Sequence, residues 1–239
     1  MNILITICAR GGSKGIPGKN IKLLNGLPLL SYSINTAQKF LNIREADISL
    51  STDSEEIRKV AQDFGLKTYY LRPESLSTDS AGKIAVIYDL LIYEEKVTQK
   101  KYDFIIDLDV TSPLRTPEDI GNALLKLENS PAAYNIFSVS PANRNPYFNM
   151  VEINEDGYCR LVKHGTTYKS RQEAPAVYEL NASFYIYRRE FFAEGFNSAI
   201  TNRSLIWKMP HICFDLDHPL DFEFLSFLIE KNKLDFTWL

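Results

Sequence analysis

A short apolar run followed by a glycine-rich, cationic loop is the feature that most limits how this chain folds. The run from Ile3 to Ile7 is almost wholly apolar, which is typical of a strand buried on both faces. The stretch from Arg10 to Asn20 then contains four glycines, one arginine, two lysines and no carboxylate. Glycines let the backbone turn sharply and bring its N–H groups close to an anion. The pattern predicts a polyphosphate site where the strand ends, with Arg10, Lys14 and Lys19 as its cations.

Two common phosphate-binding loops do not describe this stretch. The dinucleotide fingerprint Gly-x-Gly-x-x-Gly fails because Lys14 stands where a frame starting at Gly12 needs its second glycine. The P-loop pattern fails at both ends, where Ser13 and Asn20 replace the required residues. A Rossmann-type dehydrogenase is therefore disfavoured, and a plain surface turn is the remaining alternative.

Length and composition place the chain among soluble globular proteins. Its 239 residues, 45% of them hydrophobic, suffice for one domain with a substantial core. The net charge of −3 offers no basic excess for binding nucleic acid or a membrane. The three cysteines, an odd number at wide spacing, predict reduced thiols in a cytoplasmic protein. The N-terminal apolar run is too short to span a membrane, and no signal-peptide pattern precedes it.

Strand-like and helix-like segments alternate over the first half of the chain. We expect an α/β, Rossmann-like fold with a mostly parallel sheet and helices on both faces. The expected strands are 3–7, 46–51, 67–71 and 103–108, and the expected helices are 29–40, 54–64, one starting at 79–80, and 117–128. Ligands bind at the carboxyl ends of such strands. The loops 10–20, 52–53, 72–79 and 109–115 should therefore share one crevice.

Residues 133–187 break this alternation. Short β-like runs joined by Pro, Asn and Gly predict a small β-rich insertion, such as a lid, within a single domain spanning 1–239. A further strand at 206–216 and a helix at 219–231 are expected to close the chain.

A pair of carboxylates near the C-terminus predicts a cation site. On the expected strand, Asp215 and Asp217 face the crevice together while Leu216 faces the core. Adjacent carboxylates repel each other unless a cation lies between them, and Mg²⁺ prefers such hard oxygen ligands. The alternative is a solvated acidic turn before the last helix.

The stretch from Ala9 to Asn20 reads Ala-Arg-Gly-Gly-Ser-Lys-Gly-x-Pro-x-Lys-Asn. It resembles the signature of the CMP-acylneuraminate synthetases, cytidylyltransferases that activate sialic acids and related nine-carbon acidic sugars. Segments 51–53, 71–79, 107–115, 171–181 and 214–221 resemble the same family. The resemblance implies that CTP and the acidic sugar give a CMP-sugar and pyrophosphate. It also implies a homodimer, with the insertion taking part in the dimer contacts.

The resemblance also implies roles for individual residues. Arg10, Lys14 and Lys19 would act in catalysis, and Asp215 and Asp217 would hold Mg²⁺. The nucleotide would contact Ala9, Arg10, Gly11, Gly12, Lys19, Asn20 and, near the cytosine, Arg72. The sugar would contact Asp109, Thr111, Ser112, Arg171 and Asn181.

Three departures from the family pattern concern the substrate. Asp109 replaces an amide, Glu179 replaces an arginine, and Lys83 follows the 71–79 motif where small hydroxyl residues are common. Asp109 points toward bacterial relatives of sialic acid such as legionaminic acid. Two alternatives stay open. A Kdo cytidylyltransferase shares the fold but lacks Gly-Gly-Ser-Lys in its loop, and a non-catalytic nucleotide-binding module would tolerate Asp109 and Glu179.

Overall fold

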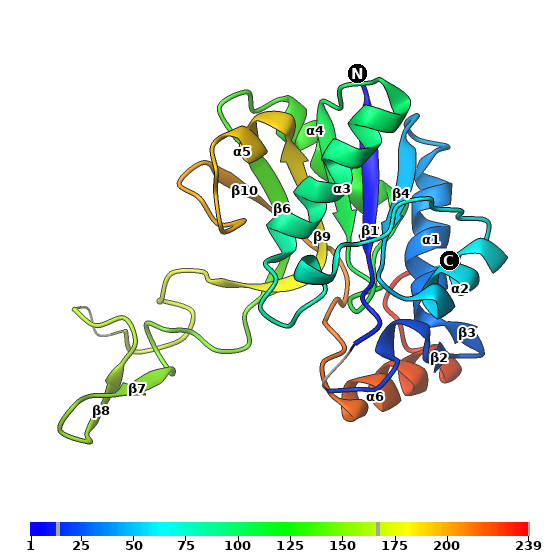
Figure 1. Cartoon of the computed structure of the whole chain (residues 1–239). Coiled ribbons are helices and arrows are strands. Elements are labelled where there is room, and N and C mark those ends of the chain that lie inside the picture. Colours follow the sequence, from blue (N-terminus) through cyan, green and yellow to red (C-terminus); the bar gives the residue numbers. More distant parts are fainter. Residues whose placement is uncertain (13–14, 166–167, 239) are drawn as a thin grey trace.

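A six-stranded, mostly parallel sheet forms the centre of the molecule (Figure 1). The computed structural model describes residues 1–12, 15–165 and 168–238. The strand order is β10-β6-β9-β5-β1-β4, and all neighbours are parallel except β9, which is antiparallel to β5 and β6. The strands are β1 (Ile3–Cys8), β4 (Asp47–Ser51), β5 (Phe104–Leu108), β6 (Asn135–Pro141), β9 (Tyr178–Arg188) and β10 (Ser204–Lys208). The predicted α/β fold is confirmed.

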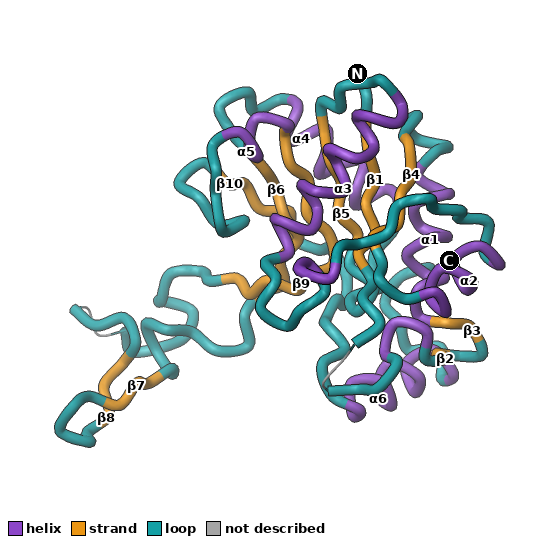
Figure 2. Tube along the Cα trace, in the orientation of Figure 1, coloured by secondary structure: helices purple, strands orange, loops and turns teal. Residues whose placement is uncertain are grey.

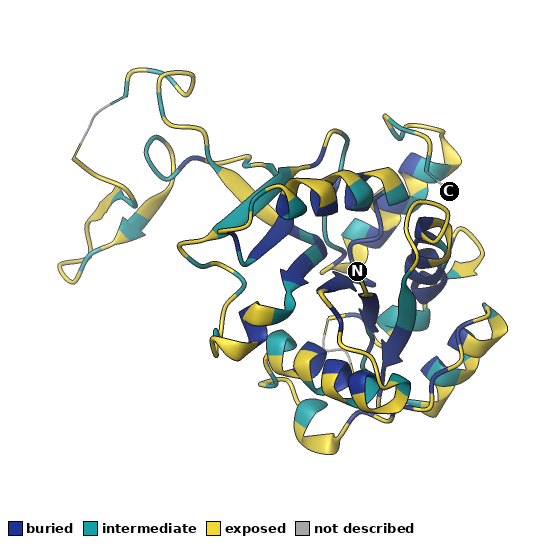
Figure 3. Ribbon diagram, turned by 90° about the horizontal axis from the view of Figure 1, so that it is seen from above, coloured by how far each residue is buried: buried dark blue, intermediate teal, exposed yellow. Residues whose placement is uncertain are grey.

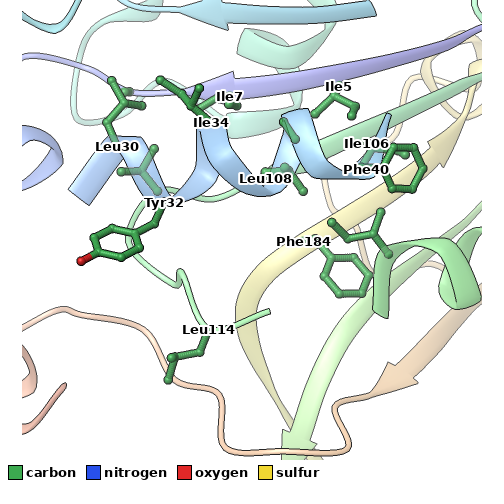
Figure 4. Packing of buried hydrophobic residues seen from close by; sticks show 14 of the residues in the cluster. Ile5, Ile7, Leu30, Tyr32, Ile34, Phe40, Ile106, Leu108, Leu114 and Phe184 are labelled. Carbon is green, nitrogen blue, oxygen red and sulfur yellow. The ribbon is translucent and has the colours of Figure 1, made fainter. Parts of the chain in front are cut away.

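Helices cover both faces of the sheet, as Figure 2 shows. The helices are α1 (Leu29–Phe40), α2 (Glu55–Asp63), α3 (Lys83–Thr98), α4 (Pro117–Glu128), α5 (Arg189–Ala193) and α6 (Pro219–Glu230), of which α6 lies beyond the lower end of the sheet in Figure 1. The alternation of side chains along β1 and β5 separates the two faces. Ile5, Ile7 and Ile106 join the large core with α1 and α4 (Figure 4). Leu4 and Ile105 join a smaller cluster with α3 and α5.

Local capping explains where two of the predicted helices begin. Thr116 and Asp119 form a reciprocal capping box at the start of α4, with Pro117 at its first turn. His218 directly precedes α6, and its N–H donates to the Asp221 carboxylate (2.7 Å) in the first turn. None of the helices in the described ranges combines the length and hydropathy needed to cross a membrane.

Three predicted boundaries are wrong. Residues 67–71 form no strand; β4 is the sheet edge, and the Thr68 hydroxyl donates to the Leu50 carbonyl in place of a strand ladder. Helix α3 starts at Lys83 after an extended Gly82, several residues later than expected. The last strand ends at Lys208, so Asp215 and Asp217 lie in a loop.

The β-rich insertion is smaller than predicted. Strands β6 and β9, which begin and end the 133–187 region, belong to the central sheet. The part outside the sheet is 142–177, which carries the hairpin β7 (Val151–Ile153) and β8 (Cys159–Leu161). This arm extends away from the body, and its residues are mostly exposed or half-buried (Figure 3).

Candidate functional site

The carboxyl ends of β1 and β5 open onto one cleft of about 290 Å³. Three of the four loops expected to share a crevice contribute to its wall, and the fourth touches the first through a hydrogen bond from Gly11 N–H to Asp53 (2.8 Å). The lining residues are Cys8, Arg10, Gly12, Lys19, Asn20, Arg72, Leu76, Thr78, Asp79, Ala81, Lys83, Val86, Asp109 and Thr111.

Hydrogen bonds and one ion pair, within the loop and to its neighbours, hold the loop after β1 in place. The Asn20 side-chain amide donates to the Arg10 carbonyl (2.9 Å), and the Arg10 guanidinium pairs with Asp79 (2.6 Å). The buried Ala9 N–H donates to the Ser51 carbonyl (2.9 Å), which fixes the loop to β4. Arg10, Gly12, Lys19 and Asn20 are thereby brought to the cleft, whereas Lys14 lies outside the described residues.

The tail of the chain meets this loop at Lys19. The Lys19 ammonium donates to the Leu216 carbonyl (2.9 Å) and lies 3.6 Å from the Asp217 carboxylate. The Leu216 N–H in turn donates to the Thr111 carbonyl (2.9 Å), and the Leu216 side chain is fully buried. A Cβ at Gly15 would lie only 2.8 Å from the Asp217 carbonyl oxygen, so loop and tail are in close contact. The cationic loop and the tail are therefore in contact at Lys19 and Gly15, but neither Asp215 nor Asp217 is among the described residues that line the cleft.

The electrostatics around Asp215 favour a cation. Burial raises the pKa of Asp215, and repulsion by Asp109 and Asp217 raises it further, while Thr111 and Lys19 act in the opposite sense. A hard cation would relieve this repulsion. Across the described ranges, no group of three or more His, Cys, Asp or Glu side chains forms a complete metal site. Two carboxylates that leave further positions to substrate phosphates are the usual Mg²⁺ arrangement, so the donor set fits that ion.

Arg72, expected near the cytosine, is buried against the end of β4. Its Nε donates to the Ser51 hydroxyl (2.9 Å) and its Nη2 donates to the Ser51 carbonyl (2.6 Å). The guanidinium therefore has a fixed orientation at the cleft wall.

Of the five residues expected to bind the sugar, two are among the described residues that line the cleft. Asp109 and Thr111 line the cleft, and Asp109 Oδ1 accepts from both the N–H and the hydroxyl of Thr111 (2.9 Å each). Ser112 is buried, donates to the Phe214 carbonyl (3.1 Å), and is not among the described residues that line the cleft.

Two further expected sugar ligands are not among the described residues that line the cleft. Asn181 is a buried residue of β9 that accepts from Ser138 (2.6 Å) and donates to Ser140 (3.0 Å), both on β6. Arg171 lies on the projecting arm and donates to the Ala142 carbonyl (2.6 Å).

Two polar residues that the sequence analysis assigned no role organise the floor of the cleft. Lys83 pairs with Asp107 and Asp109; the only sequence signal was its departure from the motif. Arg115 is fully buried and donates to the carbonyls of Asp109, Ser112 and Ser183. Its position in the Thr-Ser-Pro-Leu-Arg match was visible in the sequence, but its contacts were not.

A mostly parallel α/β sheet with a phosphate-type loop at the end of its first strand defines a nucleotide-binding protein of nucleotidyltransferase architecture. Two solved structures share this fold. A CMP:2-keto-3-deoxy-manno-octonic acid synthetase complexed with CTP superposes with a TM-score of 0.68 at 18% identity, covering 97% of this chain and 100% of that one. A 4-diphosphocytidyl-2C-methyl-D-erythritol synthase from Anaerococcus prevotii superposes with a TM-score of 0.65 at 13% identity, covering 95% of this chain and 98% of that one.

Comparison of sequences identifies the family. Residues 4–235 match the cytidylyltransferase family model, and the chain belongs to that family. It is 39% identical over 232 residues to a CMP-N,N'-diacetyllegionaminic acid synthase of Campylobacter jejuni, covering 97% of each chain. It is 39% identical to a post-translational flagellin modification protein B of Campylobacter coli, again covering 97% of each. An N-acylneuraminate cytidylyltransferase of Streptococcus agalactiae is 30% identical, over 93% of this chain and 52% of that protein. The family expected from the loop is confirmed.

Proposed function

We propose that this cytidylyltransferase transfers the cytidylyl group of CTP to a nonulosonic acid and releases pyrophosphate. The observation that carries the proposal is the contact of Lys19, which lines the cleft, with Leu216 and Asp217 of the tail. The cations of the loop would stabilise the negative charge of the departing pyrophosphate. The two carboxylates would bind a Mg²⁺ ion that also contacts the substrate phosphates.

We further propose a diacetamido sugar of the N,N'-diacetyllegionaminic type as the acceptor. Relatives named for that sugar at 39% and 32% identity, each aligned over nearly its whole length, support this choice.

The chemistry is an in-line displacement at the α-phosphorus. The anomeric hydroxyl releases its proton to water and its oxygen forms the new bond to the α-phosphorus, while the bond from that phosphorus to the α–β bridging oxygen breaks and pyrophosphate leaves. Arg10, Lys19 and Lys14 neutralise the charge that grows on the leaving group. Mg²⁺ would be held by Asp215 and Asp217 and would supply charge neutralisation at the phosphate oxygens.

The same proposal covers assembly and location. We infer a homodimer in which the arm at 142–177 lies at the interface, because this arm extends from the body and carries the exposed side chains of Val151, Ile153 and Tyr158. Its Arg171 would then be available to a site completed by both subunits. The three cysteines, all free thiols, suit the reducing cytoplasm.

The test is pyrophosphate release with CTP, Mg²⁺ and a panel of N,N'-diacetyllegionaminic, sialic, pseudaminic and Kdo acids. The diacetamido acid should give the highest kcat/KM, with a CMP-sugar as the second product. Preference for Kdo would support the eight-carbon alternative. CTP binding without pyrophosphate release from any of the four acids would support the non-catalytic module and contradict the proposal.

A further inference from the structure

Residues 234–238, which we call the strap, lie in an extended form on the body of the protein. Leu234, Phe236 and Trp238 are half-buried against the large core, whereas the two residues between them are exposed. This alternation is that of an extended chain with one face on a surface. The strap therefore has a defined place in the fold, and its contacts decide what it can do there.

One part of the strap holds the start of the acidic tail, residues 211–217. The Phe236 ring stacks on the His211 ring, with 3.6 Å between the ring centroids. The Asp235 carboxylate accepts from the Ile212 N–H (3.1 Å). These contacts fix the tail where it leaves the body.

Trp238 holds a second segment, the loop 109–115. Its indole ring stacks on the Tyr32 ring of α1, with 4.7 Å between the centroids, and its indole N–H donates to the Pro113 carbonyl (3.2 Å). The Tyr32 hydroxyl donates to the Leu24 carbonyl (2.6 Å), so the ring on which Trp238 rests is itself fixed. Trp238 thereby ties the middle of the loop to α1.

The loop and the tail also contact each other directly, on the side of the cleft. The Leu216 N–H donates to the Thr111 carbonyl (2.9 Å), and the Ser112 hydroxyl donates to the Phe214 carbonyl (3.1 Å). Asp109 and Thr111 of the same loop line the cleft. The strap is thus a second connection between two segments whose relative position shapes the cleft.

We propose that Trp238 is a positioning residue for the acceptor sugar. It contacts Pro113, and through that carbonyl it fixes the loop that presents Asp109 and Thr111 to the cleft. A group held in place before the substrate arrives costs less to order on binding. The inference rests on the proposed function, in which these two residues face the sugar.

The residues on the nucleotide side have anchors of their own. Arg72 donates to Ser51, and the Asn20 amide donates to the Arg10 carbonyl. Loss of the Trp238 contact should therefore weaken the acceptor and leave the affinity for CTP nearly unchanged.

The experiment measures the KM for N,N'-diacetyllegionaminic acid in pyrophosphate release and the affinity for CTP by calorimetric titration. Trp238→Phe keeps a ring to stack on Tyr32 but has no N–H, and the Pro113 carbonyl keeps the Arg115 N–H as a donor (2.9 Å). This variant should raise the KM for the acid about 5-fold, the factor that one neutral hydrogen bond corresponds to. Trp238→Ala also loses the stack and should raise the KM further. In both variants the Kd for CTP should stay within about twofold of the wild-type value.

A matched control separates positioning from a general loss of stability. Phe196 is a half-buried aromatic residue that packs against the smaller cluster, away from the strap. Phe196→Ala should lower Tm, as Trp238→Ala does, but leave the KM for the acid unchanged. Hydrogen exchange gives a readout that needs no turnover: Trp238→Ala should reduce protection in the loop 109–115 and leave β1 protected.

The outcomes distinguish this inference from the function on which it rests. Trp238 variants that keep the wild-type KM for the acid, or that weaken CTP as much as the acid, overturn the inference alone. Unchanged exchange in the loop overturns it as well. A wild type that releases no pyrophosphate overturns the proposed function, and the exchange measurement then decides whether Trp238 holds the loop. If Trp238→Ala does not fold, Trp238→Phe gives the same comparisons.

Discussion

Replacing Arg115 by Met tests whether a buried guanidinium holds the floor of the cleft together. Its Nη1 donates to the carbonyls of Asp109 (2.9 Å), Ser112 (2.7 Å) and Ser183 (2.8 Å), and its Nη2 donates to the Ser33 hydroxyl (2.5 Å). These contacts join α1, the loop after β5, and β9. Burial lowers the pKa of Arg115 to about 10, which leaves it charged at neutral pH.

The magnitude follows from what the variant loses and what it keeps. Hydrogen bonds to a charged group contribute about 1.5–3 kcal/mol each. Each of the three carbonyls keeps a second donor: the Ser33 hydroxyl for Asp109, the Ser183 hydroxyl for Ser112 and the Asp109 N–H for Ser183. Removing the guanidinium also ends the cost of burying a charge and an unpaired Nε. We expect the free energy of unfolding to fall by about 2–4 kcal/mol, within the upper range for single substitutions.

The assay is urea unfolding followed by circular dichroism, with thermal melts alongside. A loss of this size should lower Tm by roughly 4–16 °C for a chain of this length. Arg44→Met is the matched control, since Arg44 pairs with Glu128 at the surface (3.3 Å) and should change stability by less than about 1 kcal/mol. If Arg115→Met were no more destabilising than Arg44→Met, the assigned role of Arg115 would be refuted.

Three further outcomes are expected. Lys19→Ala should lower kcat about 10²–10³-fold in pyrophosphate release while the circular dichroism spectrum is unchanged; near-normal turnover would exclude its role. Gly15→Ala should raise the KM for CTP, because its Cβ would meet the Asp217 carbonyl at 2.8 Å; an unchanged KM would mean that loop and tail move independently. Burial alone would lower the pKa of His211, but the contact with Asp119 (2.9 Å) outweighs burial, and the pKa of His211 is raised. The His211–Asp119 pair therefore stabilises the fold fully below about pH 6.5, and this contribution is lost as the pH rises through the raised pKa of the folded state. Between pH 6 and pH 8.5 the urea midpoint of unfolding should therefore fall further for the wild type than for His211→Gln. An equal fall in both proteins would contradict the pairing of His211 with Asp119.

The sequence predicted those parts of the fold that local patterns determine. Pro117 predicted the start of α4 correctly, and the structure adds the capping box of Thr116 and Asp119 around it. The apolar run of β1 and the glycine loop after it located the first wall of the cleft.

Long-range pairing determined the rest. Residues 67–71 have strand-like composition but lie beyond the sheet edge without a ladder partner, so composition misled there. Strand β9 inserts between β5 and β6, an order that no local pattern encodes. Lys83 and Asp109 are 26 residues apart, and their pairing appears only once α3 is placed against β5. Charge pairs of this kind depend on the fold, which is why the sequence showed Lys83 only as a departure from a motif.

The central claim is that the two ends of the chain serve one nucleotide, and the rate of pyrophosphate release from CTP tests it most directly. The comparison is between the wild type, Arg10→Met from the first loop and Asp217→Asn from the tail, with CTP, Mg²⁺ and the diacetamido acid. Both variants should remain folded and lose about 10²–10³-fold in rate, as expected when a group that contacts the reacting phosphates is removed. If either variant kept a rate within threefold of the wild type, the account of a shared triphosphate site would be contradicted.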